Sequence, residues 1–180
     1  YKFDLHLPTG LVANSVDTPR CAQATAALAN CAAASRVGDV TTAIGTGSQT
    51  LSMTGGIYNV VPSGNEPARL SAALDVQVGP YDLGKLAIPV TTSLRSSDYG
   101  VDTETTLPAR YEGVPVRIRS MQIKLDGVAD QGTGSTADDQ PFMINPSKCA
   151  THTITADMES TLGATVSVSD TFDTDNCGAV

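Results

Sequence analysis

The stretch VPVRIRSMQIKL, residues 114–125, carries the pattern that decides the fold class. Its apolar residues recur at every second position, which is the period of a strand with one buried face. The phase changes once: Val114, Val116 and Ile118 share one phase, and Met121, Ile123 and Leu125 share the other. A β-bulge inserts one extra residue into a strand and shifts its phase in this way. The stretch therefore predicts a bulged strand, with the bulge near Arg119–Ser120.

Stretches on both sides of this one alternate in the same manner. The clearest are YKFDLHL at 1–7, RLSAALDVQV at 69–78 and KLAIPVTTSL at 85–94. Turn residues separate such stretches about every 8–14 residues, which is typical of antiparallel all-β folds. We therefore expect an antiparallel β-sandwich of about nine or ten strands. A lipocalin-like barrel is the alternative architecture, although the chain has no Trp to place near its first strand.

Two local features refine the expected strands. Gly55-Gly56, inside QTLSMTGGIYNVV at 49–61, predicts the tight turn of a hairpin, because glycine adopts the positive φ that such turns need. Pro89 cannot donate a hydrogen bond to a neighbouring strand. The strand at 85–94 is therefore expected to lie at an edge or to be irregular at Pro89.

A single helix is expected within DTPRCAQATAALANC, residues 17–31. Thr18 suits the capping position, Pro19 the first helical position, and the alanines from Ala22 to Ala29 favour a helix. So short a helix is not stable alone in water. We expect a disulfide between Cys21 and Cys31 to hold it against the body of the fold.

The four cysteines Cys21, Cys31, Cys149 and Cys177 allow three pairings. The local pairs Cys21–Cys31 and Cys149–Cys177 are preferred. A zinc site is the weaker alternative, because the chain has no C-x2-C spacing and only two histidines. Two disulfides predict an oxidising compartment, so the protein is expected to be secreted, at the cell surface or periplasmic.

Length and charge restrict the possible partners. The 180 residues suit one domain over 1–180. Eleven Lys and Arg against 19 Asp and Glu leave a formal charge of −8, which disfavours nucleic acid and anionic membranes. No apolar run approaches the ~20 residues of a membrane-spanning helix.

Several motifs together resemble a known group of proteins. They are LPTGLVANSVDTPRC at 7–21, ASRVGDV at 34–40, YNVVPSGNEPARL at 58–70, SSDYGVDTE at 96–104 and PFMINPSKC at 141–149. The chain resembles bacterial secreted and cell-surface β-rich domains with an LP-x-G-L…C…C…S-x-V-G opening and a PF-x-x-NP-x-x-C segment. The resemblance implies export, disulfides and one module of a longer chain with neighbouring domains. It carries no catalytic residue, since no activity is assigned to that group, and the motif residues are of the types that form turns.

Two ligand sites are considered. Tyr81, Tyr99 and Tyr111 lie in or near expected turns and form the candidate platform for a sugar ring. A calcium site is considered on the oxygen ligands within SDTFDTDNCG: Asp170, Asp173, Asp175 and Asn176. This segment lacks the full calcium-binding loop pattern, so no cofactor is required.

Catalysis is the least favoured function. Two histidines and no G-x-S-x-G sequence offer little for a hydrolase. His6 is expected on the polar face of its strand and His152 on an apolar face. The sequence thus favours a non-catalytic structural or adhesive module. A carbohydrate- or small-ligand-binding module, with or without the help of calcium, is the alternative, and a hydrolase comes third.

Overall fold

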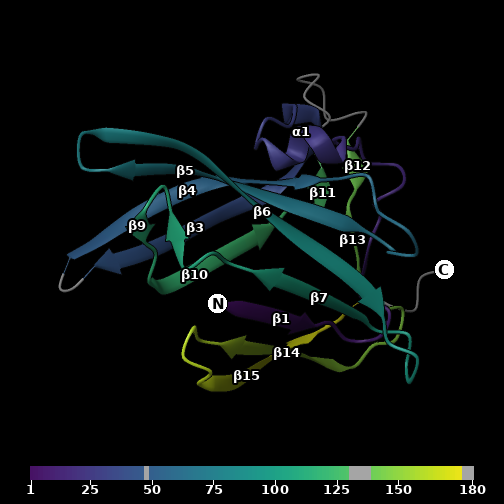
Figure 1. Ribbon diagram of the computed structural model, residues 1–180. Helices are drawn as coiled ribbons and strands as arrows, with labels where there is room; N and C mark the ends of the chain where they lie inside the picture. The colour runs from purple at the N-terminus through teal and green to yellow at the C-terminus, as the bar shows by residue number, and fades with distance from the viewer. Residues whose placement is uncertain (47–48, 130–138, 176–180) are drawn as a thin grey trace.

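The computed structural model describes residues 1–46, 49–129 and 139–175, and it consists mostly of antiparallel strands (Figure 1). One sheet contains nine strands in the order β10-β3-β4-β5-β6-β7-β1-β14-β15. Their bounds are Lys2–His6 for β1, Arg36–Thr46 for β3, Gln49–Asn59 for β4, Arg69–Val78 for β5, Tyr81–Leu94 for β6, Val101–Thr106 for β7, Ile118–Leu125 for β10, Thr151–Glu159 for β14 and Thr165–Asp173 for β15. The expected antiparallel all-β class is confirmed.

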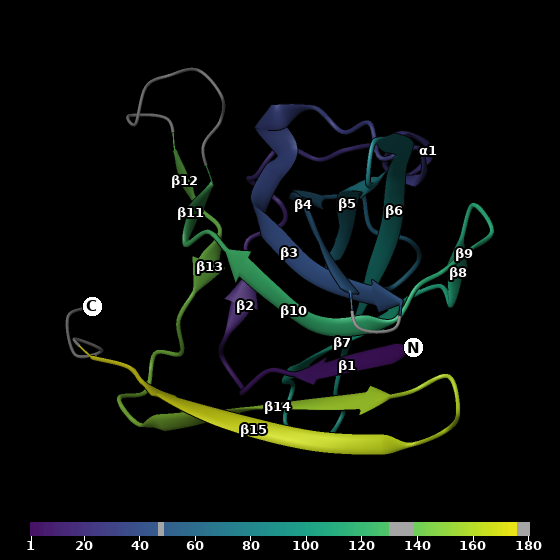
Figure 2. The same ribbon diagram turned by 90° about the vertical axis from the view of Figure 1, so that its left-hand side faces the viewer.

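The sheet curls strongly around its own inner face. Strands β3 to β7 follow one another as a meander, and β1 lies between β7 and β14. The curl places β10 opposite β1 and β7 (Figure 2). Side chains from all three strands line one interior. The two halves thus face each other across a core, as the layers of a sandwich do. Among the described residues, no hydrogen-bonded ladder joins β10 to β1 or to β15, so the roll stays open, unlike a lipocalin-like barrel.

Short elements complete the fold. Three two-stranded ribbons pair β2 (Val12–Ala13) with β13 (Met143–Ile144), β8 (Arg110–Tyr111) with β9 (Val114–Pro115), and β11 (Val128–Ala129) with β12 (Gln140–Pro141). A helix, α1 (Gln23–Ala27), precedes a 3₁₀ turn, η1 (Ala33–Ser35).

The helix lies where it was expected but is shorter. It begins at Gln23 rather than near Pro19, and Ala22 occupies the capping position without a side-chain hydrogen bond. The hydroxyl of Thr18 instead donates to the carbonyl of Asn14. The Cys21–Cys31 disulfide spans the helix, with 5.5 Å between the Cα atoms. Cys149 is also disulfide-bonded, and its expected partner, Cys177, lies outside the described residues.

The buried side chain of Asn59 holds this helical segment to the sheet. Asn59 ends β4, and its Nδ2 donates to the carbonyls of Ser15, Thr18 and Pro19 at 3.0–3.3 Å. Next to it, the amide of Cys21 donates to the carbonyl of Asn59. One polar side chain therefore fixes the path of the chain into the disulfide loop.

Strand details confirm two predictions and correct one. The register of β10 against β3 shifts between Ile118 and Ser120, so the bulge is present, at Arg119. Pro89 pairs opposite Ser71 in β5, while β7 pairs with β6 only from Val90 onward, so one side of β6 is open at Pro89 as expected. The hairpin turn at Gly55-Gly56 was wrong. Both glycines lie inside β4, and a Cβ on Gly55 would come within 1.9 Å of the carbonyl oxygen of Ala73.

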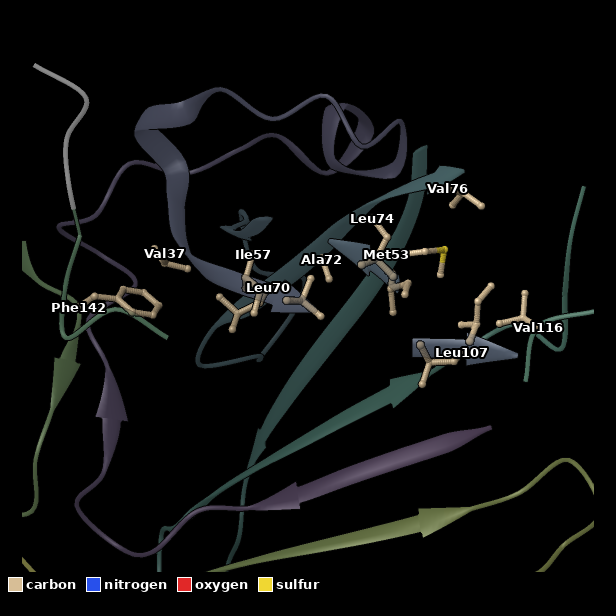
Figure 3. Close-up of a cluster of buried hydrophobic side chains, with 13 residues drawn as sticks. Val37, Met53, Ile57, Leu70, Ala72, Leu74, Val76, Leu107, Val116 and Phe142 are labelled. Carbon is tan, nitrogen blue, oxygen red and sulfur yellow. The ribbon is translucent and has the colours of Figure 1, made fainter. Parts of the chain in front are cut away.

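The core follows the inner face of the sheet. Ile57 of β4 and Leu70, Ala72 and Leu74 of β5 point into it together (Figure 3). The fully buried ring of Phe142 fills one end (Figure 3).

Candidate functional site

The inner face of the rolled sheet encloses an apolar hollow of about 90 Å³. Its deep walls are buried aliphatic side chains, among them Val40 of β3, Met53 of β4 and Leu74 of β5. These strands alternate with period 2, so every second side chain is directed inward. A dry apolar cavity of about 150 Å³ binds benzene or xenon, so a smaller apolar hollow can accept part of a hydrocarbon. The hollow is therefore the first candidate for a ligand site.

The mouth of the hollow is lined by apolar side chains that water can reach. Leu5 of β1, Leu86 of β6 and Met121 of β10 are half-buried, and Ile123 of β10 is 45% exposed. The bulge at Arg119 contributes directly, because it lets Ile118 and Met121 face inward although they are three residues apart. The extra residue that shifts the phase thus turns the apolar side chains on both sides of the bulge toward the hollow.

Polar groups are scarce in the lining. Thr42, Thr103 and Thr105 supply its hydroxyl groups, and among the described residues no charged side chain lines it. The hydroxyl of Thr42 already donates to the carbonyl of Ser120 at 3.0 Å. The lining that the described residues form can exclude water and enclose hydrocarbon, and it contains no group suited to proton transfer or nucleophilic attack.

The apolar inner face continues beyond the mouth onto the β14–β15 hairpin. Phe3 lies opposite Met158, and Met158 lies opposite Val166. In the next row, Val168 shares the same face, and Val166 and Val168 are 52% and 49% exposed. An apolar group lying across the mouth would therefore meet further apolar surface on this hairpin.

The outer face of the same strands is polar and centres on His6. Its Nδ1 lies 2.8 Å from Asp102 Oδ1 on β7, and its Nε2 lies 3.1 Å from Asp157 Oδ2 on β14. The hydrogen bond to Asp102 raises the pKa of His6, and the bond to Asp157 acts in the same direction against partial burial. Partial burial acts to raise the pKa of Asp102, but hydrogen bonds from His6 and Arg95 outweigh it and the pKa is lowered. His6 is on the polar face, as expected.

Arg95 extends this cluster into the turn that follows β6. Its guanidinium donates to both carboxylate oxygens of Asp98, to Asp102 and to the carbonyl of Leu7. The Arg95 side chain, with the amide of Gly100, holds the pKa of Asp98 far below its usual range. A Cβ on Gly100 would lie 1.8 Å from Arg95 Nη2, so a larger residue there would displace the guanidinium from these partners.

These contacts bring two of the sequence motifs together. The hydroxyl of Thr9, in the LPTG segment, donates to Asp98 of SSDYGVDTE at 3.1–3.2 Å. In the PFMINPSKC motif, the carbonyl of Phe142 accepts from the amide of Asn14 at 2.7 Å. These hydrogen bonds thus connect the loop segments that lead into several strands, which is a structural role for the motif residues.

The three tyrosines do not form one platform. Tyr81 begins β6 and is 70% exposed, whereas Tyr99 lies beyond the other end of that strand and is 75% exposed. Fourteen residues of strand span about 45 Å. Tyr111 is half-buried, and its hydroxyl donates to the carbonyls of Leu83 and Lys85. A shared sugar platform is not assembled from these residues.

The acidic residues considered for calcium also point apart. Asp170 and Asp173 are three positions apart on β15, so they lie on opposite faces. Asp173 accepts from the hydroxyl of Thr151 at 2.6 Å, and Asp170 accepts from the amide of Thr171. Asp175 is exposed, and Asn176 lies outside the described residues. Within residues 1–46, 49–129 and 139–175, no three His, Cys, Asp or Glu side chains are grouped to hold a metal ion.

His152 occupies a structural position. Its ring is half-buried, lies 5.4 Å from the ring of Phe172, and places Nε2 within 3.1 Å of the Lys148 carbonyl and 3.2 Å of the Thr174 hydroxyl. The expected hydrogen-bond partner of a partly buried ring is therefore present.

Sequence reasoning did not find the hollow as a site. Its signals were present in the inward phases of residues 1–7 and 114–125, but nothing local shows that these two strands face each other. Comparisons with protein-family models, with curated proteins and with solved structures return no match. No helix in the described part of the chain has the length and apolar character to span a membrane.

Proposed function

We propose that this chain is a non-catalytic binding module that takes an aliphatic group into the hollow of the curled sheet. The observation that carries this proposal is the open, uncharged mouth, where apolar side chains such as Leu86 and Ile123 remain accessible to water. Covering such a surface with hydrocarbon releases water, and the binding free energy becomes more favourable by roughly 25 cal/mol per Å² of apolar area buried. The gain requires no hydrogen-bond partner from the protein.

The chemistry of the lining favours an aliphatic over an aromatic or charged ligand. Of the described residues in the lining, Phe3 alone is aromatic, so they offer no pair of rings to sandwich a flat ligand. In the same part of the chain no cation lines the mouth, and the formal charge of −8 opposes an anionic head group. An uncharged alkyl chain, whose tip enters the hollow while its remainder lies on the apolar surface, fits these constraints.

The proposed setting is an exported protein, either secreted, at the cell surface or in the periplasm. The Cys21–Cys31 disulfide and the disulfide-bonded Cys149 support an oxidising compartment. In that setting the module has a structural or adhesive role, and the hollow gives it a definite ligand chemistry. Adhesion to a surface that presents alkyl chains would use the same site.

The methionines provide the readout for a test. Met53 and Met121 line the hollow, whereas Met143 does not. With methyl-labelled methionine, titration with 1-octanol should shift the Met53 and Met121 signals together and leave Met143 nearly unchanged. Octanoate should bind more weakly than 1-octanol, because its carboxylate meets no cation at the mouth.

A substitution that fills the hollow tests the same proposal. Ala72→Leu adds three carbons to a residue of the lining, and it should abolish the octanol-induced shifts. The control is Ala87→Leu, the same change on the opposite face of neighbouring β6, since Ala87 lies opposite Ala73 rather than Ala72. Unmoved Met53 and Met121 signals at saturating octanol, or full binding by folded Ala72→Leu, would refute the proposal.

A further inference from the structure

We infer that copies of this chain associate head to tail, with β15 of one copy adding to the β10 edge of the next. The inference concerns the two edges of the sheet and does not depend on a ligand in the hollow. Both edges carry backbone groups without a neighbouring strand, because β10 and β15 end the strand order in the described chain. Such edges are templates for pairing with another chain.

The β15 edge is long, exposed and acidic. β15 spans nine residues, and all but Phe172 have exposed side chains. The segment from Thr151 to Asp175 contains five acidic residues and no Lys or Arg: Asp157, Glu159, Asp170, Asp173 and Asp175. Its inner face presents Val166 and Val168, which are about half exposed.

The β10 edge has the opposite charge. Residues 114–125 contain Arg117, Arg119 and Lys124 and no acidic residue, within a chain of formal charge −8. The side chains of Arg117 and Lys124 are exposed, and Lys124 reaches Asp126 only at 3.7 Å. The inner face of this edge presents Ile123, which is 45% exposed.

Opposite charges on the two edges select one pairing out of three. Charged edge residues normally protect a sheet from aggregation. Here a β10–β10 contact would place Arg and Lys against each other, and a β15–β15 contact would place Asp against Asp. Only β10 with β15 brings unlike charges together, so repulsion removes the symmetric dimers and leaves the head-to-tail contact.

An antiparallel contact gives the better match along the strands. Run antiparallel, the end of β15 that holds Asp170 and Asp173 lies beside the beginning of β10, where Arg117 and Arg119 lie. In this orientation the inner faces of the two copies lie on opposite sides of the joined sheet, because β10 and β15 run in the same direction within one copy. The contact is therefore selected by charge and by backbone pairing. The contact continues the antiparallel sheet from one copy into the next, and because it does not close on itself it produces open chains of copies.

Sedimentation velocity on the whole chain tests the inference. At low salt, up to about 1 mM protein, the weight-average sedimentation coefficient should rise steadily with concentration beyond that of a dimer. Raising the salt to about 1 M should return it toward the monomer value, because the charges are then screened within about 3 Å.

Variants that reverse the charge of one edge at a time provide the decisive part of the experiment. The pair Asp170→Lys and Asp173→Lys on β15 should abolish association, and so should Arg117→Glu with Lys124→Glu on β10. Mixing these two variants should restore it, because each edge again meets an unlike edge. The control, Asp75→Lys with Asp82→Lys near the β5–β6 turn, changes the net charge equally but leaves both edges intact and should associate like the parent.

Each other outcome would overturn the inference. A monomer at every concentration in low salt, an association that stops at a dimer, or association unchanged by both reversals would show that these edges do not pair. A mixture of folded reversal variants that stays monomeric would do the same. Circular dichroism of each variant establishes that it is folded.

Discussion

The Nδ1 atom of His6 lies 2.8 Å from Oδ1 of Asp102, across the boundary between β1 and β7. The other ring nitrogen reaches Asp157 on β14, so one imidazole connects three adjacent strands. Only a protonated ring donates from both nitrogens. The contact therefore makes the junction between β1 and its two neighbours sensitive to pH.

The direction of this pH dependence follows from the raised pKa of His6. Its stabilisation is complete below the unfolded value of about 6.5 and is lost as the pH rises through the higher folded value. We expect the free energy of unfolding to fall as the pH rises above about 6.5, by at most about 1 kcal/mol because the side chain is 36% exposed. His6→Gln should flatten this slope in urea titrations. A slope that is unchanged in His6→Gln would assign it to other groups.

Deleting Arg119 should cost little stability. The residue is the bulge, and its removal leaves Ile118 and Met121 facing inward with regular pairing to β3. Deleting Gln122 is the control, since it turns Ile123 and Leu125 toward the outer face. Urea midpoints should show a small shift for the first deletion and a large loss for the second. Equal losses would contradict the role of Arg119 as the extra residue.

Asn59→Ala should destabilise the fold by about 2 kcal/mol. The change leaves the carbonyls of Ser15, Thr18 and Pro19 without their buried donor. Asn65→Ala, at an exposed turn, should be nearly silent. The difference is measured by urea unfolding, and a silent Asn59→Ala would mean that water replaces its amide without cost.

Gly55→Ala should be among the more damaging small substitutions. Its Cβ would lie 1.9 Å from the carbonyl oxygen of Ala73, inside the pairing of β4 with β5. We expect a loss of about 2–3 kcal/mol, because the backbone of a central strand has to move. Gly127→Ala serves as the control, since no atom lies within 4 Å of the added carbon. Thermal unfolding with equal melting temperatures for both variants would refute the argument.

Removing the Cys21–Cys31 disulfide should cost about 2.5–3 kcal/mol, by the chain-entropy estimate for its loop. Cys21→Ser with Cys31→Ser should lower the urea midpoint while the strand signal in circular dichroism persists below it. Loss of the strand signal in buffer would show instead that the sheet depends on this loop.

The local period of the sequence predicted most strands but not how they meet. Residues 69–78 alternate clearly and form β5, residues 85–94 form most of β6, and the phase slip predicted a bulge near Arg119–Ser120, where the register shifts. The turn predicted at Gly55 was wrong because glycine is required both in tight turns and where two backbones lie very close together. The predicted helix start was wrong because the Thr18 hydroxyl donates to the Asn14 carbonyl, while the Asn59 side chain donates to the carbonyl of Thr18. Such contacts join residues that are distant in sequence.

The candidate site was hidden for the same reason. The apolar phases of β1 and β10 were visible, but the curl that turns them toward one hollow arises from nonlocal pairing of the whole sheet. The candidate tyrosines and aspartates were chosen by residue type alone, and their strands separate them.

The position of β1 determines the order in which the fold can be completed. Leu5 pairs with Thr103 on one side and Ala156 on the other, so both neighbours of β1 lie about a hundred residues or more away along the chain. The β3–β6 meander can assemble from neighbouring segments, whereas β1 must wait for distant partners, and such nonlocal closure is slow. In pulsed hydrogen exchange during refolding, amides of β3–β6 should gain protection before those of β1. Until then, the apolar side of β1 is open to solvent, so a partly folded chain is most exposed to misassembly at this strand.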